Sequence, residues 1–247
     1  SLDEQYGRVG IQGKAVFKRQ VGKIVSAHAE VANIHFRSDE ILGLYSRLVK
    51  KEYPSFLNHL GELDLKGTVR YRRDGECRAD ANVGTEVGGL QTSLRWQDHI
   101  YTLECQSENF SVARLLKDES MPDNLAFRLE TTANMNAGAH PDITADIKVD
   151  KVDYHGYSYN NLALDGSWIK QKLSVGFSSS DENLSADGRM EAFFDGHRFS
   201  APQLAAVIRK LSPARLRLYD GWGDTDISAS VSADFKTSAL SEPDGNV

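Results

Sequence analysis

The feature that most constrains this chain is an alternation of apolar and polar residues with a period of two. In one segment Leu63, Leu65 and Val69 alternate with charged and polar residues. Successive side chains of a β-strand point to opposite faces, so this pattern predicts strands that each have one buried face. The segments that show the pattern most clearly are 9–17, 63–71, 90–96, 143–149, 162–168, 173–177 and 227–235.

Short turn signals separate these segments. Arg73-Asp74-Gly75 and Gly88-Gly89 are typical of the tight connections between antiparallel strands. The sequence therefore predicts an all-β fold built on one largely antiparallel sheet of many strands.

Three segments instead carry the spacing of a helix: 38–49, 112–116 and 202–211. Ser38 suits an N-cap, and Pro202 suits the first turn of a helix. We expect two or three short helices that cover an edge of the sheet. Each candidate helix follows a phenylalanine near the end of a strand pattern, namely Phe36, Phe110 or Phe199.

No flexible linker or low-complexity segment interrupts the chain, which favours one continuous body over residues 1–247. An apolar-x-apolar-x-Gly element recurs and ends at Gly13, Gly67 and Gly166. Recurring strand units are typical of an elongated array in which each unit packs on its neighbours. The chain begins abruptly, without a signal peptide or an anchor, so we expect it to be a fragment of a longer protein.

The net charge and the absence of catalytic motifs argue against several classes of function. The 29 Lys and Arg against 35 Asp and Glu give a net charge of −6, which argues against a nucleic-acid partner. No sequence motif for a catalytic nucleophile, a zinc site or a phosphate loop is present, so we expect no enzymatic activity and no cofactor. Cys77 and Cys105 are expected to pack in the sheet, with a disulfide as the alternative.

Three polar or aromatic clusters have two interpretations each. Asp224 and Asp226, and the run Asp181-Glu182-Asn183, resemble calcium ligands, but neither supplies the six or more oxygens of a calcium loop, so solvated turns are favoured. Tyr157 and Tyr159 share one strand face and predict either a sugar-stacking surface or a pair of cross-strand tyrosines in a hairpin.

Several ordered segments resemble a known family. Asn109–Leu116 is similar to an "n-f-x-l-x-x-L-L" step, residues 152–166 to a "y-n-G-Y-x-Y-x-n-i-x-l-x-G" signature, and residues 173–184 to an "f-x-g-x-l-x-i-x-D-x-n-l" step. These steps are those of TamB proteins of Bacteroidota, within the AsmA-like superfamily. Residues 198–204 and 243–247 fit the next unit and the start of another. The resemblance is tight over 109–247 and looser over 7–107.

The resemblance implies a strongly curved sheet folded into an open apolar trough, in the manner of a β-taco. It implies a periplasmic segment of a protein anchored in the inner membrane of a Gram-negative bacterium. Such proteins are associated with phospholipid transport between the membranes and with outer-membrane biogenesis. The family's inner-membrane anchor, and the region expected to meet an outer-membrane barrel partner, have no counterpart in these residues.

Phospholipid acyl chains are then the expected ligand, held by aliphatic side chains with small residues leaving room between them. The alternative is a β-rich structural or glycan-recognising surface module with a filled core. An interior lined by lipid predicts uncovered apolar side chains, whereas a filled core predicts apolar side chains that bury one another. The groove-lining set expected from the alternation is Leu63, Leu65, Val69, Leu94, Leu129, Ile147, Leu162, Leu164, Val175, Phe177 and Val231.

Overall fold

The protein is all-β, as the alternation predicts. The computed structural model describes residues 10–20, 23–49, 52–136, 140–194, 199–219, 221, 223–235 and 245–246. The strands are β1 (Gly10–Gln20), β2 (Lys23–Arg37), β3 (Glu62–Arg72), β4 (Cys77–Thr85), β5 (Gly88–Gln97), β6 (Ile100–Phe110), β7 (Asp123–Asn134), β8 (Asp142–Tyr154), β9 (Tyr157–Ile169), β10 (Lys172–Ser180), β11 (Leu184–Phe194), β12 (Phe199–Leu211), β13 (Ile227–Phe235) and β14 (Gly245–Asn246). The helices are α1 (Ser38–Val49), the 3₁₀ helix η1 (Ser55–Leu60) and α2 (Val112–Leu116).

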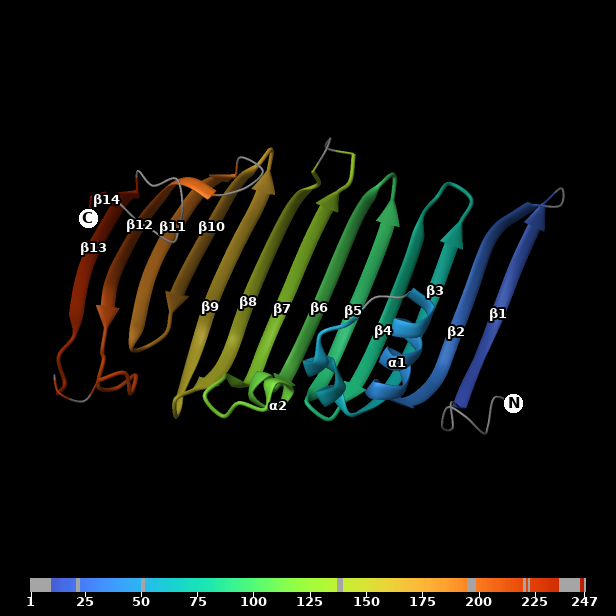
Figure 1. Ribbon diagram of the computed structural model, residues 1–247, viewed down its shortest axis with the longest axis horizontal. Coiled ribbons are helices and arrows are strands. Elements are labelled where there is room, and N and C mark those ends of the chain that lie inside the picture. The colour runs from blue at the N-terminus through green and yellow to red at the C-terminus, as the bar shows by residue number, and fades with distance from the viewer. Residues whose placement is uncertain are drawn as a thin grey trace. The chain divides into compact units, whose positions relative to one another are not determined.

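The strands form one 14-stranded sheet whose spatial order is the order of the chain, from β1 to β14 (Figure 1). Successive strands pair antiparallel, as the turn signals predict. Every predicted strand segment falls within an observed strand except for Val9, which lies outside the described residues. The chain divides into two compact units, unit 1 (residues 1–126) and unit 2 (residues 127–247), and each is described by itself. The single continuous body expected from the sequence stays a prediction.

Neither unit is strongly curled, so the strong curvature expected from the resemblance is corrected. The reason lies in the ladders. Pairing runs without a register shift from β3 to β6 and from β8 to β11. Sheets bend sharply where a bulge inserts an extra residue into one strand. In the described ladders such shifts occur only in pairs of β2 with its neighbours and of β12 with its neighbours.

Two-residue turns join several of the strands. Asp98-His99, His155-Gly156 and Lys170-Gln171 each have positive φ at both positions, between 49° and 75°. Positive φ at both central residues defines the type I′ turn, whose twist matches that of the paired strands. These turns fix the register of β5–β6, β8–β9 and β9–β10.

Two of the three predicted helices are confirmed, and one is wrong. α1 and α2 occupy the predicted segments 38–49 and 112–116. The segment 202–211 belongs instead to strand β12, which pairs with both β11 and β13. Its apolar residues fit a strand as well as a helix, and two available strand partners decide the outcome. Pro202 lies at a shift in the β11–β12 register, where a missing backbone N–H is tolerated.

Three buried serines begin the longer connections. Ser38, Ser111 and Ser212 are at most 2% exposed. Their backbone N–H groups donate to Gly61, Val87 and Asn183 carbonyls at 2.9, 2.7 and 3.0 Å, respectively. The Ser111 hydroxyl also accepts from the Arg114 N–H at 3.1 Å as the N-cap of α2. Each serine therefore ties the end of a strand to the adjoining connection at that edge.

In unit 1 these connections lie together at one end of the strands, the helix edge (residues 38–49, 52–61, 86–87 and 111–122). α1 and α2 both pack against η1, and His59 Nδ1 lies 2.7 Å from the Leu115 carbonyl oxygen. The opposite edge, the turn edge, carries the tight turns 73–76 and 98–99. The helices therefore cover only one end of the strands.

Substitutions at the adjacent residues Gly88 and Gly89 test how closely the backbones pack at the helix edge. Gly88 has φ of +138°, and a Cβ there would lie 2.8 Å from both the Asn109 carbonyl oxygen and the Phe110 Cα, whereas a Cβ at Gly89 meets nothing within 4 Å. We expect Gly88→Ala to lower the free energy of unfolding by about 3 kcal/mol and Gly89→Ala to change it by less than about 1 kcal/mol. Urea denaturation followed by circular dichroism measures both. Equal losses in the two variants would contradict the proposed backbone contact.

Candidate functional site: the apolar face of each unit

The ladders of unit 1 place its apolar residues on one face. Leu65 lies opposite Val83, which lies opposite Leu90. One step along, Val69 lies opposite Ala79, which lies opposite Leu94. Directly opposite residues in adjacent strands share a face. The predicted residues Leu63, Leu65, Val69 and Leu94 therefore lie on one surface, the apolar face of unit 1.

Unit 2 has an apolar face of the same kind. A single cross-strand row, meaning residues directly opposite one another in successive strands, contains four of the predicted residues. Leu162 and Val175 lie two residues along the same strands from members of this row, so they share its face. The row is Ile147, Leu164, Phe177, Gly188, Ala206 and Val231. The remaining predicted residue, Leu129, is half-buried in β7.

Much of both apolar faces is uncovered. Val69, Leu94 and Leu164 are 42–43% exposed, and Phe177 is 37% exposed. Near the helix edge the same face of unit 1 is closed, since Leu63 is buried. Within the described parts of the chain, the apolar face of unit 1 is thus covered at Leu63, and several large apolar side chains on the faces of both units stay partly exposed.

Small residues shape this face. A Cβ on Gly188 would lie 2.3 Å from the ring of Phe177, so the ring lies directly against the glycine backbone. A Cβ on Gly67 would lie 2.5 Å from the Asp80 carbonyl oxygen. Gly67 itself lies opposite Ala81, and Gly166 lies opposite Ala145. Small residues therefore lie opposite one another at several positions on both faces.

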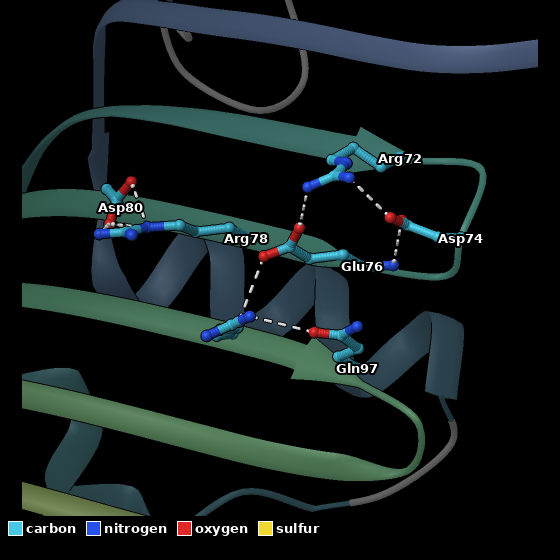
Figure 2. A network of polar contacts seen from close by, with 7 residues as sticks. Arg72, Asp74, Glu76, Arg78, Asp80 and Gln97 are labelled. Atoms are coloured by element: carbon cyan, nitrogen blue, oxygen red, sulfur yellow. Dashed lines mark hydrogen bonds and ion pairs between the residues drawn. The ribbon is translucent and has the colours of Figure 1, made fainter.

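The opposite face is polar and held by ion pairs (Figure 2). Arg72 pairs with Asp74 at 2.8 Å and with Glu76 at 2.9 Å, and Glu76 also pairs with Arg95 at 3.2 Å. Arg78 pairs with Asp80 at 3.0 Å. Burial raises the pKa of Asp80, but hydrogen bonds from Ser93 and Arg78 outweigh it and hold the pKa below its usual value. The contrast between the two faces makes the sheet amphipathic.

The two tyrosines considered for sugar stacking form an internal cluster. Tyr157 and Tyr159 meet edge to face with ring centroids 4.8 Å apart, and Tyr159 is buried. The Tyr157 hydroxyl donates to the Asp181 carboxylate at 2.6 Å and accepts from the Asn183 side-chain amide at 3.1 Å. Tyr157 lies directly opposite Tyr154 of β8, which fits the hairpin interpretation, and burial leaves the Tyr159 ring unavailable for stacking on a sugar.

Asp181 is the centre of that cluster and is 4% exposed. It also accepts from the backbone N–H groups of Asn160 and Asn183, both at 2.8 Å. Burial pushes the pKa of Asp181 upward, but hydrogen bonds from Tyr157, Asn183 and Asn160 outweigh it and hold the pKa below the usual 3.8. The run 181–183 thus connects β10 to β11 through a hydrogen-bonded carboxylate.

The other acidic candidates are also engaged within the protein. Asp226 accepts a short hydrogen bond from Ser212, and Asp224 pairs with Arg215 at 3.4 Å. Across the described residues, no group of three or more His, Cys, Asp or Glu side chains is arranged to hold a metal ion.

The cysteines are free, which resolves the alternative left by the sequence. Cys77 lies in β4 and Cys105 in β6, with β5 between them. Strands lie about 4.8 Å apart, so the two Cα atoms are about 10 Å apart or more, beyond the span of roughly 7 Å that a disulfide allows. Burial raises the pKa of the Cys105 thiol, which fits a packed and unreactive side chain.

The sequence did not indicate that aromatic residues align at the turn edge. Tyr71, Trp96 and Tyr101 occupy one cross-strand row with Cys77. The available signal is that each aromatic residue lies within two or three positions of a turn, but only the register shows that they are neighbours.

No family model, no curated protein and no solved structure matches the chain.

The Asp181 cluster yields a stability prediction. Asp181→Asn is expected to lower the free energy of unfolding by about 2 kcal/mol at pH 7, because the buried donors lose a charged acceptor. The folded-state pKa lies below that of the unfolded chain. The carboxylate's contribution is therefore present above the unfolded-state value and is lost as the pH falls through the folded-state value. The difference from the parent protein should shrink below about pH 4.

Glu182→Gln is the matched control, because Glu182 is the exposed neighbour of Asp181. Urea titrations of the three proteins between pH 3 and pH 7 measure the effect. A difference between Asp181→Asn and the parent that stays constant across this range would refute the role of the charge.

Proposed function

We propose that this chain is a non-enzymatic segment of a lipid conduit, in which the apolar face of each unit shields phospholipid acyl chains from water. The observation that carries the proposal is the row Ile147–Leu164–Phe177–Gly188–Ala206–Val231, an apolar surface across six strands with Leu164 and Phe177 more than a third exposed. In a filled-core module these side chains would bury one another. Their exposure supports a surface that a ligand covers.

The energetics of acyl-chain transfer favour such a surface. A fourteen-carbon chain in water costs on the order of 11 kcal/mol, at about 0.8 kcal/mol per methylene. Similar aliphatic side chains in successive rows offer comparable affinity at each step. Transport needs binding that is weak and spread over many sites, as ion conduction does. The small residues of these rows leave width for a chain to move.

The cellular setting is part of the proposal and rests on the resemblance to TamB proteins. In this proposal the segment lies in the periplasm of a Gram-negative bacterium. Other regions of the full-length protein form the inner-membrane anchor and contact the outer-membrane barrel partner. In the periplasm the segment would support outer-membrane biogenesis. Among the described residues, no helix has the length and apolar character needed to span a bilayer.

The glycan-binding alternative has less support. Its two aromatic residues would have to present their rings to solvent, but Tyr159 is buried and the Tyr157 hydroxyl is held by Asp181. A carbohydrate array would still test it directly, and binding there together with a lipid-free protein would favour the alternative.

Leu164→Asp tests the conduit. The residue is 43% exposed, so an aspartate can be accommodated in the fold but places a charge beside the acyl chain. We expect at least a tenfold loss of affinity for a fluorescent fatty acid and loss of co-purifying phospholipid in native mass spectrometry. Val175→Asp, from the adjoining row, should act in the same direction.

Ser178→Asp is the matched control, because Ser178 is exposed and lies opposite Ala163 on the polar face of the same strand pair. Circular dichroism establishes that each variant is folded. If folded Leu164→Asp binds the fatty acid as well as Ser178→Asp does, the apolar face is not the binding surface.

A further inference from the structure

The turn edge of unit 1 ends in a row rich in aromatic residues. On the apolar face the last complete cross-strand row is Phe17, Ala27, Tyr71, Cys77, Trp96 and Tyr101. The next row inward has the same register and contains no aromatic residue: Ala15, Ala29, Val69, Ala79, Leu94 and Leu103. Aromatic side chains are therefore concentrated at this boundary of the apolar face.

These aromatic side chains are exposed rather than packed into a core. Phe17 is 59% exposed, and Tyr71, Trp96 and Tyr101 are 37–39% exposed. Trp96 and Tyr101 stack with ring centroids 6.1 Å apart. Rings with one polar end and one apolar end are favoured at the level of lipid headgroups.

The polar face at the same edge is basic. Arg70 lies directly opposite Arg78, which lies directly opposite Arg95. Like charges at such positions destabilise a sheet, and Asp80 and Glu76 offset part of that repulsion by pairing with Arg78 and Arg95. By sequence, residues 16–28, 70–80 and 95–102 carry eight Lys and Arg against four Asp and Glu, a balance of 8 − 4 = +4 in a chain of net charge −6.

The arginines of this edge can reach an external anion. The side chains of Arg72, Arg78 and Arg95 are 52–65% exposed, so they stay accessible to solvent although each also pairs with a carboxylate. Among the described residues Arg70 and Arg73 have no carboxylate within salt-bridge distance, although the charge of Arg70 helps to lower the pKa of Asp80. Figure 2 shows the carboxylates of Asp74 and Glu76 held by Arg72 and that of Asp80 held by Arg78, and Glu76 also pairs with Arg95.

We infer that the turn edge of unit 1 is a contact surface for an anionic phospholipid bilayer. The aromatic row lies at headgroup level, with the aliphatic rows behind it, and the arginines reach the phosphates from the other face. An aromatic boundary beside a basic one fits a bilayer surface, since a free phosphate would use only the charges, and the net charge of −6 argues against a nucleic acid. The inference goes beyond the proposed function, because docking on a bilayer does not require acyl chains on the apolar face.

Co-flotation of the 247-residue chain with vesicles tests the inference. The vesicles are phosphatidylcholine alone or phosphatidylcholine with 30% phosphatidylglycerol, at low and high salt. We expect binding to the anionic vesicles only, weakened by salt. Arg70→Gln/Arg73→Gln should bind roughly 30-fold more weakly, because each lost positive charge removes about 1 kcal/mol of attraction to the anionic surface. Lys66→Gln/Lys117→Gln removes two exposed charges of unit 1 away from this edge and should bind like the parent protein.

Brominated lipids test the aromatic row separately. They should quench tryptophan fluorescence in the parent protein and quench it much less in Trp96→Phe. The inference is overturned if the protein binds neutral and anionic vesicles equally, or if the two charge variants lose equal affinity. It is also overturned if the protein self-associates without binding vesicles, or if it binds inorganic phosphate but not vesicles.

The two proposals fail separately. If only the bilayer contact is wrong, Leu164→Asp still loses the fluorescent fatty acid while no variant affects flotation. If only the conduit is wrong, Arg70→Gln/Arg73→Gln still loses flotation while fatty-acid binding is absent or unaffected by Leu164→Asp.

Discussion

The structure depends on the register between neighbouring antiparallel strands. Because side chains alternate along a strand, a slip of one residue would move a whole apolar set to the polar face. Type I′ turns such as Asp98-His99 and Lys170-Gln171 hold that register over ladders that contain no bulge. The result is a sheet in which Leu164, Phe177 and Val231 share one face, although up to 67 residues separate them in the chain (231 − 164).

An amphipathic sheet of this kind needs its apolar face covered, and the described connections cover only part of it. Ser38, Ser111 and Ser212 anchor the connections at strand ends, and the residues buried beneath them include Leu63 and Leu216. Away from these ends the aliphatic side chains stay partly open. No second layer of strands covers this face among the described residues, so part of its apolar surface stays open.

Parts of this arrangement were accessible from the sequence. The alternation predicts the strands and the faces of Leu63, Val69 and Leu94, and the helical spacing of 38–49 and 112–116 predicts α1 and α2. The prediction of a helix at 202–211 was wrong because the apolar residues of β12 fit both periods, and pairing with β11 and β13 decides between them. The prediction of a strongly curved sheet was wrong, because ladders without bulges do not bend as bulged ladders do.

By itself, the sequence determined the local properties of this protein: which segments are strands, which side of each strand is apolar, and where the chain turns. Those properties follow from the geometry of a single strand and need no partner. The tertiary structure alone decided what lies opposite what. It set Tyr71 and Trp96 in one row, placed Arg70 against Arg78, separated Cys77 from Cys105 by a strand, and buried Asp181 among its donors. Such relations depend on register between distant segments, which local preferences do not encode.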